Sequence, residues 1–210
     1  MSKFAKRVLD FTSALIGIVL LWPVMLAIGF AIRLRMGNPV LFRQQRPGYH
    51  AHPFAILKFR TMVVCDTAAT MHSDAERLTP LGIRLRRCSL DELPQLRNVL
   101  KGEMSLVGPR PLLMEYLERY TPEQARRHDV KPGITGWAQV QGRQDLPFSK
   151  RLELDVWYVD HQSFWLDLRI LWMTIAKLGR GSGVHSGQDV RTVDDLGLHP
   201  ATRAREGVRD

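Results

Sequence analysis

The chain has 210 residues, a formal net charge of +9 and two cysteines, Cys65 and Cys88, which are too few for a disulfide framework and fit a reducing compartment. With about 35 residues assigned to a membrane element, the rest suffices for one domain with its own core. The positive charge suits nucleic acid, anionic lipid or anionic small substrates, but the sequence has no helix-turn-helix spacing, zinc-finger pattern or aromatic-basic RNA motif, so no nucleic acid partner is expected.

The first element is an apolar run from Phe11 to Ile32 that contains no charged side chain. About 20 apolar residues suffice for a helix to cross a bilayer, so the length permits a straight span. Pro23 lies near the middle and lacks the backbone N–H of a continuous helix, which predicts a kink or a turn-back. Lysine and arginine prefer the cytoplasmic side and here flank both ends, so a re-entrant helix-break-helix over residues 1–35 is favoured over a straight span. A cleaved signal peptide is disfavoured, because the run exceeds the usual core of ~7–15 residues and bulky arginines follow it.

Two short strands are predicted next. Met36-Gly37-Asn38-Pro39 is typical of a turn, and residues 39–46 then predict a strand. Residues 54–62 predict a second strand, in which Lys58 and Arg60 project from the same face. Two cations on one face indicate an anion site; the alternative is a half-exposed strand with solvated charges.

An acidic pair, Asp91 and Glu92, lies within a ring of arginines. The guanidinium groups come from Arg84, Arg86 and Arg87 before the pair and from Arg110, between two prolines, after it. Adjacent carboxylates can hold a divalent cation while arginines bind phosphate oxygens, so one interpretation is phosphoryl transfer. The other is structural: Ser89-x-x-Glu92 has the spacing of a capping box, in which the glutamate reaches back to the Ser89 amide. Either way the pair lies at a helix N-terminus, where exposed amides favour negative charge.

The segments around this pair follow from local signals. Residues 67–77 lack an apolar stripe and predict a polar helix or a mobile loop, and residues 81–87 alternate polar and apolar side chains with period two. The helix that carries the pair is expected to end near Lys101-Gly102, where glycine can adopt the left-handed conformation. An amphipathic helix is predicted from Pro111 to Tyr120, and a polar helix from Thr121 onward.

The C-terminal part combines a glycine-rich loop with aromatic helices. Residues 131–143 predict a loop and a strand whose backbone can approach a ligand closely. Residues 150–178 predict helices with part of their aromatic content in the core, and the tryptophan-rich stretch 163–178 also suits a helix at the headgroup level of a membrane. The polar tail, residues 181–210, is expected to be weakly ordered.

Five ordered motifs stand out along the chain: Lys58 to Met62, Ser89 to Leu96, Asn98 to Gly102, Met104 to Pro111 and Lys131 to Trp137. Together they resemble the motifs of the bacterial sugar transferases, the monotopic phosphoglycosyl transferases. The resemblance covers most of residues 1–180, and the chain is similar to the minimal form of that family. It implies transfer of a sugar phosphate from a UDP-sugar to a polyprenyl phosphate such as undecaprenyl phosphate, with release of UMP.

The resemblance also implies roles for residues in these motifs. Asp91 would be the nucleophile that holds the phosphosugar as an acyl phosphate, and Glu92 would bind Mg²⁺. The cations expected to bind substrate phosphates are Lys58, Arg60, Arg86 and Arg110. Arg60 is included because the strand pattern places it on the same face as Lys58.

Further positions are expected beside the active site or in the membrane. Asp155 and Arg143 are placed in the neighbourhood of the active site. The loop around Arg143 and the tail from Val184 onward are the segments expected to recognise the sugar. Pro23 matches the family's membrane break, although Trp22 stands where the family often has serine.

These predictions combine into an α+β fold with a re-entrant membrane helix at residues 1–35, a mainly helical catalytic domain with a small sheet and interfacial amphipathic helices at residues 36–180, and a polar tail at residues 181–210. The expected location is the cytoplasmic face of the bacterial inner membrane. Expected partners are a UDP-sugar, polyprenyl phosphate and membrane lipid, with downstream glycosyltransferases and a second copy of the chain as further candidates. A catalytically silent membrane-surface scaffold is the alternative. Glycoside hydrolysis is rejected, because it needs two carboxylates ~5–9.5 Å apart on opposite sides of the scissile bond, and two neighbouring residues at one helix start do not easily take such positions.

Overall fold

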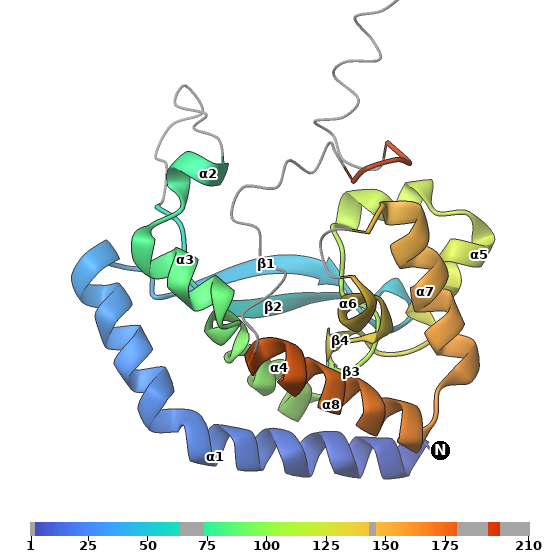
Figure 1. The fold of residues 1–210 in the computed structure, drawn as a ribbon, viewed down its shortest axis with the longest axis horizontal. Coiled ribbons are helices and arrows are strands. Elements are labelled where there is room, and N and C mark those ends of the chain that lie inside the picture. The colour runs from blue at the N-terminus through green and yellow to red at the C-terminus, as the bar shows by residue number, and fades with distance from the viewer. Residues whose placement is uncertain (1–2, 64–73, 143–145, 180–192, 198–210) are drawn as a thin grey trace, which may run out of the picture.

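The computed structural model describes residues 3–63, 74–142, 146–179 and 193–197. A long helix, α1 (Lys3–Met36), lies along one side of the molecule, and the other elements pack on its inner side (Figure 1). Among the described residues, helices predominate over strands, which confirms the predicted α+β architecture with a small sheet.

The described strands form two small sheets. The first is an antiparallel pair, β1 (Leu41–Pro47) and β2 (Pro53–Phe59), and the second is a parallel pair, β3 (Ser105–Val107) and β4 (Gly133–Thr135). The α-helices beyond α1 are α2 (Asp74–Arg77), α3 (Pro80–Arg87), α4 (Gln95–Lys101), α5 (Pro122–Ala125), α6 (Trp137–Gln141), α7 (Phe148–His161) and α8 (Phe164–Gly179). Short 3₁₀ helices are η1 (Tyr49–Ala51), η2 (Leu90–Glu92), η3 (Met114–Arg119) and η4 (Arg126–His128).

Helix α1 is continuous but bent about midway along its length (Figure 1). Pro23 lies within it, and a proline in a helix removes one hydrogen bond and crowds the preceding turn, which explains a bend. The structure thus has a bent helix where the sequence predicts a helix-break-helix. By length and composition, α1 could cross a membrane.

The N-terminal end of α1 is held to the globular part by polar contacts. Arg7 donates hydrogen bonds of 2.5 and 2.6 Å to the last carbonyl oxygens of α4, those of Val99 and Leu100. Asp10 is buried and accepts a 3.0 Å hydrogen bond from the Ser105 hydroxyl of β3. Charged side chains in these first turns are therefore satisfied by protein rather than by water.

The C-terminal end of α1 is held to the same globular part. Ile28 and Ile32 pack in one buried cluster with Phe59 of β2 and Leu85 of α3. Arg60, which follows β2, donates hydrogen bonds to carbonyl oxygens at the end of α1 and just after it, where the helix itself supplies no donor. Both ends of α1 are consequently anchored on one body.

The parallel pair β3–β4 is unusually close because glycines line it. A Cβ atom on Gly133 would lie 2.1 Å from the backbone nitrogen of Gly108, which no side chain tolerates. The Gly108 amide donates a 2.9 Å hydrogen bond to Thr135, and the Gly133 amide donates a 3.0 Å bond to Pro109. The approach of these backbones fixes where the chain leaves β3, immediately before Arg110.

Two segments differ from their sequence-based predictions. Residues 81–87 belong to α3 rather than to a period-two element, because Thr79 accepts a 3.0 Å hydrogen bond from the Gly82 amide and Pro80 starts the helix. The helix predicted from Pro111 begins only at Met114 and is the 3₁₀ helix η3. The residue before it, Leu113, is extended, so the helical stretch is shorter than its amphipathic pattern suggests.

Residues 193–197, the part of the polar tail that the structure describes, pack on the domain. Val193 is buried with Phe148 and Leu152 of α7, and its carbonyl accepts a 2.8 Å hydrogen bond from the Phe148 amide. Asp195 accepts a 3.0 Å hydrogen bond from the Ser149 amide and thereby caps the start of α7.

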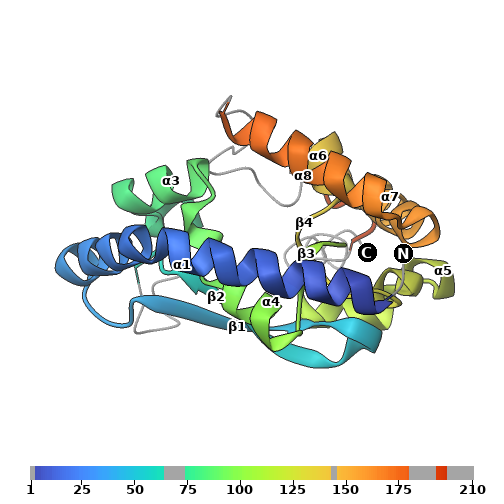
Figure 2. The same cartoon turned by 90° about the horizontal axis from the view of Figure 1, so that it is seen from below.

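Helix α8 carries an exposed aromatic face. Trp165, Trp172 and Ile175 are 75%, 71% and 65% exposed, while Ile170 on the opposite side is fully buried. In the view from below, α1 runs across the front of the molecule and α8 runs along its upper edge (Figure 2). The Lys6–Asp167 ion pair, 2.5 Å long, joins the two helices. The predicted headgroup-level position of α8 remains a prediction that this exposed face suits.

Candidate active site

The acidic pair lies in η2, a single turn between α3 and α4. Ser89, which precedes it, is left-handed with φ 54° and makes no side-chain capping bond. Glu92 does not reach back to Ser89 but forms hydrogen bonds with cations from other segments. The capping-box interpretation is therefore wrong, because the Ser89 backbone is not in the extended conformation that an N-cap needs.

Glu92 is the centre of a compact ionic cluster. One of its oxygens, Oε1, accepts from Lys58 Nζ at 2.7 Å and from Arg110 Nη2 at 2.7 Å. Burial alone would raise the pKa of Glu92, but Arg110 and Lys58 hold it well below its ordinary value through charge and hydrogen bonds. Glu92 is thus a fixed anion that aligns a lysine from β2 and an arginine from the loop after β3.

Asp91 is 7% exposed and lies in the electric field of the same cluster. Burial raises the pKa of Asp91 above its ordinary value, and the negative charge of Glu92 raises it further. Nearby cations oppose this rise; in order of effect they are Lys58, Arg110 and Arg86. A carboxylate with a raised pKa is more basic, and therefore a better nucleophile, than an ordinary aspartate.

Arg86 reaches the cluster from α3. Its Nε donates a 3.0 Å hydrogen bond to the Thr61 hydroxyl, just beyond β2. The close approach of Gly82 to the Thr61 backbone, where an added Cβ would lie 2.1 Å from the carbonyl oxygen, sets this distance between α3 and β2. Three of the four cations expected to bind phosphate, Lys58, Arg86 and Arg110, thus act electrostatically on Asp91.

Arg60 differs from the prediction. Strand β2 ends at Phe59, so the alternation that would put Arg60 beside Lys58 does not continue. Arg60 is 6% exposed, and its guanidinium donates 2.7 and 3.0 Å hydrogen bonds to the carbonyl oxygens of Gly37 and Asn38. Its position makes it a clamp on the end of α1 rather than a member of the acidic cluster.

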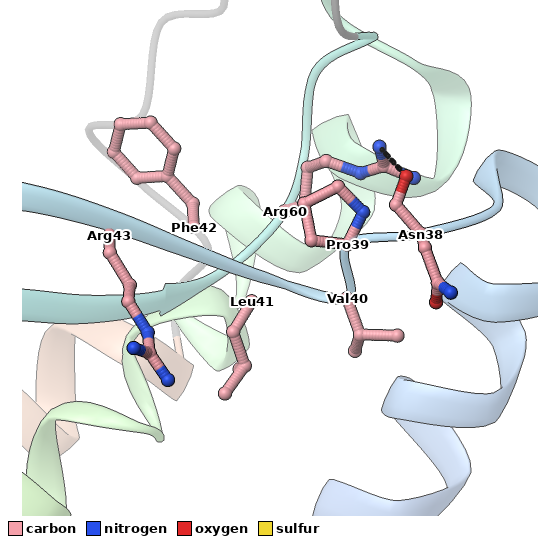
Figure 3. Close-up of a pocket in the computed structure, with 7 residues that line it drawn as sticks. All are labelled: Asn38, Pro39, Val40, Leu41, Phe42, Arg43 and Arg60. Carbon is pink, nitrogen blue, oxygen red and sulfur yellow. Dashed lines mark hydrogen bonds between the residues drawn. The ribbon is translucent and has the colours of Figure 1, made fainter.

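A hollow lies at this clamp, away from the acidic pair (Figure 3). It measures about 670 Å³ and is lined by Asn38, Pro39, Val40, Leu41, Phe42, Arg43 and Arg60. Figure 3 shows the Arg60 guanidinium turned toward the Asn38 carbonyl. The lining contains neither carboxylate, and we assign the chemistry to the ionic cluster because reactive groups converge there.

Asp155 does not contact the acidic pair directly. It lies in α7 and forms a buried ion pair of 2.6 Å with Arg127 of η4. Arg127 in turn donates a 2.6 Å hydrogen bond to the backbone carbonyl of Arg110. The expected neighbour Arg143 lies outside the described residues.

Two arginines near the site were missed by sequence reasoning. Arg127 stands in a polar segment without a motif, so only its contact with Arg110 marks it. Arg46 of β1 is a second case: burial lowers its pKa to about 10, and the positive charge of Arg110 is the next cause. The like charges of Arg46 and Arg110 extend the positive field of the site beyond Glu92.

The geometry brings cations together around a buried pair of carboxyl groups, and the described part of the chain also contains one apolar helix long enough to cross a membrane. The family model for bacterial sugar transferases matches residues 1–181. The chain belongs to the bacterial sugar transferase family, as the motifs predict.

Individual relatives agree with this assignment. The chain is 50% identical over 186 residues to the uncharacterized sugar transferase EpsL of Bacillus subtilis, covering 88% of this chain and 92% of that protein. It is 43% identical over 186 residues to the UDP-glucose:undecaprenyl-phosphate glucose-1-phosphate transferase of Xanthomonas campestris, covering 83% of this chain and 38% of that protein. It is 36% identical over 202 residues to the undecaprenyl-phosphate galactose phosphotransferase of Salmonella typhimurium, covering 88% and 42%. The chain therefore spans about two fifths of the length of these two named transferases.

Proposed function

We propose that this protein transfers a sugar phosphate from a UDP-sugar to undecaprenyl phosphate, giving undecaprenyl diphosphate sugar and UMP. The observation that carries the proposal is the cluster in which Glu92 binds Lys58 and Arg110 beside the buried Asp91 carboxyl. A cluster with these cations suits a diphosphate substrate, since guanidinium and ammonium groups bind phosphate oxygens through charge-assisted hydrogen bonds. Among the relatives, one is a UDP-glucose:undecaprenyl-phosphate glucose-1-phosphate transferase and another is an undecaprenyl-phosphate galactose phosphotransferase.

In the proposed mechanism, a carboxylate oxygen of Asp91 attacks the phosphorus that bears the sugar. The bond between this phosphorus and the bridging oxygen breaks, and that oxygen leaves with UMP. Asp91 then carries the phosphosugar as an acyl phosphate. A phosphate oxygen of undecaprenyl phosphate attacks the same phosphorus, and the Asp91 carboxylate is regenerated.

Cations of the site lower the barrier to attack by an anion on an anion. Arg110 and Lys58 are already aligned by Glu92, and Arg86 of α3 also acts electrostatically on Asp91. Their donors can bind the oxygens on which charge develops as the bridging bond breaks. The raised pKa of Asp91 adds nucleophilicity, while these cations oppose the rise and favour the ionised carboxylate.

The donor set also fits Mg²⁺. The described part of the chain has no cluster of three or more His, Cys, Asp or Glu side chains, so a cation there would take most of its ligands from substrate and water. Mg²⁺ is usually bound in this way, through one or two carboxylates plus phosphate oxygens. Glu92 would hold it, and the ion would neutralise part of the diphosphate charge.

We further propose that α1 enters and leaves the membrane on the cytoplasmic face. The support is that Arg7 and Asp10 at one end, and Ile32 and the Arg60 clamp at the other, all contact the same globular part. A straight span would place these two ends on opposite sides of a bilayer about 30 Å thick. The bend in α1 brings them back to one side.

The test is the intact mass of the purified protein after incubation with Mg²⁺ and a panel of UDP-sugars that includes UDP-glucose and UDP-galactose, without lipid. We expect one donor to add the mass of its sugar phosphate and to release UMP. Asp91→Asn should show neither, since an amide is not a nucleophile at phosphorus. Turnover that requires lipid and proceeds without an adduct would indicate direct attack by the lipid instead. Absence of turnover with every donor and lipid would support the silent scaffold.

A further inference from the structure

Arg127 and Asp155 form an ion pair that is almost completely inaccessible. Their side chains are 1% and 4% exposed, and two guanidinium nitrogens of Arg127 reach the same Asp155 oxygen at 2.6 and 3.2 Å. Burial of charge is costly, and a buried pair is often no more stabilising than apolar residues of similar volume. Stability alone is therefore a weak reason for this pair to occupy the core.

The contacts of Arg127 point to the active site. Its Nη2 donates a 2.6 Å hydrogen bond to the backbone carbonyl of Arg110, and its Nη1 donates a 3.2 Å bond to the Tyr120 hydroxyl. The Arg127 guanidinium is thus fixed by Asp155 in α7 and by Tyr120 after η3. Its Nη2, which also bonds Asp155, holds the backbone of Arg110, and the Arg110 side chain binds Glu92.

Arg110 needs such support because its side chain is the most exposed member of the cluster. Its side chain is 44% exposed, against 23% for Lys58 and 14% for Glu92. An arginine side chain has several rotatable bonds, so its donors are placed reproducibly only when its backbone is fixed. Pro109 and Pro111 restrict the backbone torsions on either side, and the hydrogen bond from Arg127 fixes the direction of the carbonyl between them.

We propose that Arg127, oriented by Asp155, is a positioning residue that sets the Arg110 guanidinium for the phosphate groups of the nucleotide-sugar donor. This inference rests on the proposed function. It assigns to Asp155 an indirect role, through Arg127 and the Arg110 backbone, in place of contact with substrate.

Arg126 provides a matched control. It is the neighbour of Arg127 in η4 and also pairs with a carboxylate of α7, Asp160, as well as with Glu123. Its ion pairs are exposed and do not include Arg110. Arg126→Gln thus removes the same type of charge and the same η4–α7 connection without touching the proposed route to the site.

The experiment is a double-mutant cycle on the full chain in membranes, with Arg127→Gln and Arg110→Gln alone and together. We expect Arg127→Gln to raise the KM for the UDP-sugar about tenfold with kcat changed less than about twofold, the scale of one lost charge-assisted hydrogen bond. In the Arg110→Gln background the same change should raise KM by less than about twofold, because the guanidinium that Arg127 is proposed to position is gone. Arg126→Gln should leave KM and kcat at wild-type values.

Two further variants keep the proposal testable if Arg127→Gln fails to fold. Arg127→Lys retains the charge but not the fork that reaches Asp155 and Arg110 together, and Asp155→Asn retains shape but not charge. Both should raise the donor KM and leave the KM for undecaprenyl phosphate unchanged, with thermal unfolding used to confirm that each variant is folded. Effects of Arg127 and Arg110 changes that multiply independently, or equal losses with Arg126→Gln, would overturn the inference. Lack of any transferase activity in the wild-type protein would instead contradict the proposed function.

Discussion

At the scale of single residues, the neighbours Asp91 and Glu92 have opposite electrostatic settings. Burial raises the pKa of Asp91, whereas Arg110 and Lys58 hold the pKa of Glu92 well below its ordinary value despite burial. Environments that separate two carboxyl groups in this way commonly separate their roles. Asp91 is suited to attack, and Glu92 is suited to hold cations in place.

The raised pKa of Asp91 predicts an acid limb in the pH dependence of the donor kcat/KM. Attack needs the carboxylate, so activity should fall as the pH drops through this raised pKa. Arg86→Gln removes a cation that lowers the pKa of Asp91, so the limb should move to higher pH. Arg84→Gln is the control, because Arg84 is exposed on the same helix. A pH–rate profile measured for both variants checks the shift, and identical profiles would count against Asp91 as the nucleophile.

Glu92→Gln should impair both cation alignment and metal binding. The amide carries no charge to hold Lys58 and Arg110, which now bind the carboxylate at 2.7 Å each. We expect kcat/KM to fall on the order of 10²-fold and the Mg²⁺ concentration for half-maximal activity to rise. Titration of activity with Mg²⁺ measures this, with the exposed Glu153→Gln on α7 as the control. An unchanged Mg²⁺ requirement would remove Glu92 from the metal site.

At the scale of elements, the site is a turn, η2, placed between two helices and beside a two-stranded sheet. Local sequence signals correctly predicted where several helices begin or end. Gly102 ends α4 in the left-handed conformation with φ 84°, and Thr121 forms a capping box with Gln124 at the start of α5. These features depend on residues within four positions of each other, so a sequence pattern is sufficient to indicate them.

Elements that depend on distant contacts were predicted less well. The alternation in residues 81–87 suggests period two, but the capping of α3 by Thr79 and its packing on Thr61 decide for a helix. Lys58 and Arg60 are two positions apart, yet β2 ends between them and they serve different sites. A period-two pattern identifies a shared face only as far as the strand continues.

Arg60 supports a prediction about the element that it clamps. Arg60→Gln should lower the free energy of unfolding by about 2 kcal/mol, since the carbonyl oxygens at the end of α1 and just after it lose their donors. The donor KM should not change, because Arg60 binds α1 rather than the acidic cluster. Thermal unfolding and donor kinetics are compared with those of Arg43→Gln, an exposed residue of the same hollow. A raised KM with normal stability would restore Arg60 to phosphate binding.

At the scale of the whole molecule, both ends of α1 are anchored to one globular part. Arg7 and Asp10 tie the start, and Ile28, Ile32 and the Arg60 clamp tie the end. Between these anchors the outward side chains are large and exposed, including Leu20 and Leu26 at 70% and 62%. An apolar middle with protein-bound ends fits a helix that dips into one leaflet.

This arrangement predicts that tags on the two termini report the same, cytoplasmic, side of the membrane. Protease protection in inverted and right-side-out vesicles measures their location. A periplasmic N-terminus in an active protein would contradict the re-entrant proposal.

Pro23→Ala should act against the bend. The substitution restores a backbone donor and favours a straight α1. Anchoring both ends of the helix to the globular part would then require bending it, at a cost in folding free energy of about 3 kcal/mol, the scale of a proline's effect on a helix. We expect lower thermal stability and lower transferase activity in membranes. Val24→Ala, which trims the neighbouring side chain without changing the backbone, is the control. Wild-type behaviour of Pro23→Ala would mean that side-chain packing alone bends α1.

Sequence patterns were sufficient to indicate the acidic pair, the apolar helix with its proline, and the helix ends that nearby residues cap. Each of these features depends on residues that are close together in the chain, where composition and spacing suffice. The contacts of the folded chain were needed to find that Glu92 binds Lys58 and Arg110 instead of Ser89, that Arg60 binds the end of α1, and that Arg127 and Asp155 hold the Arg110 backbone. A charged side chain takes the partner that folding buries beside it, and that partner can be many residues away.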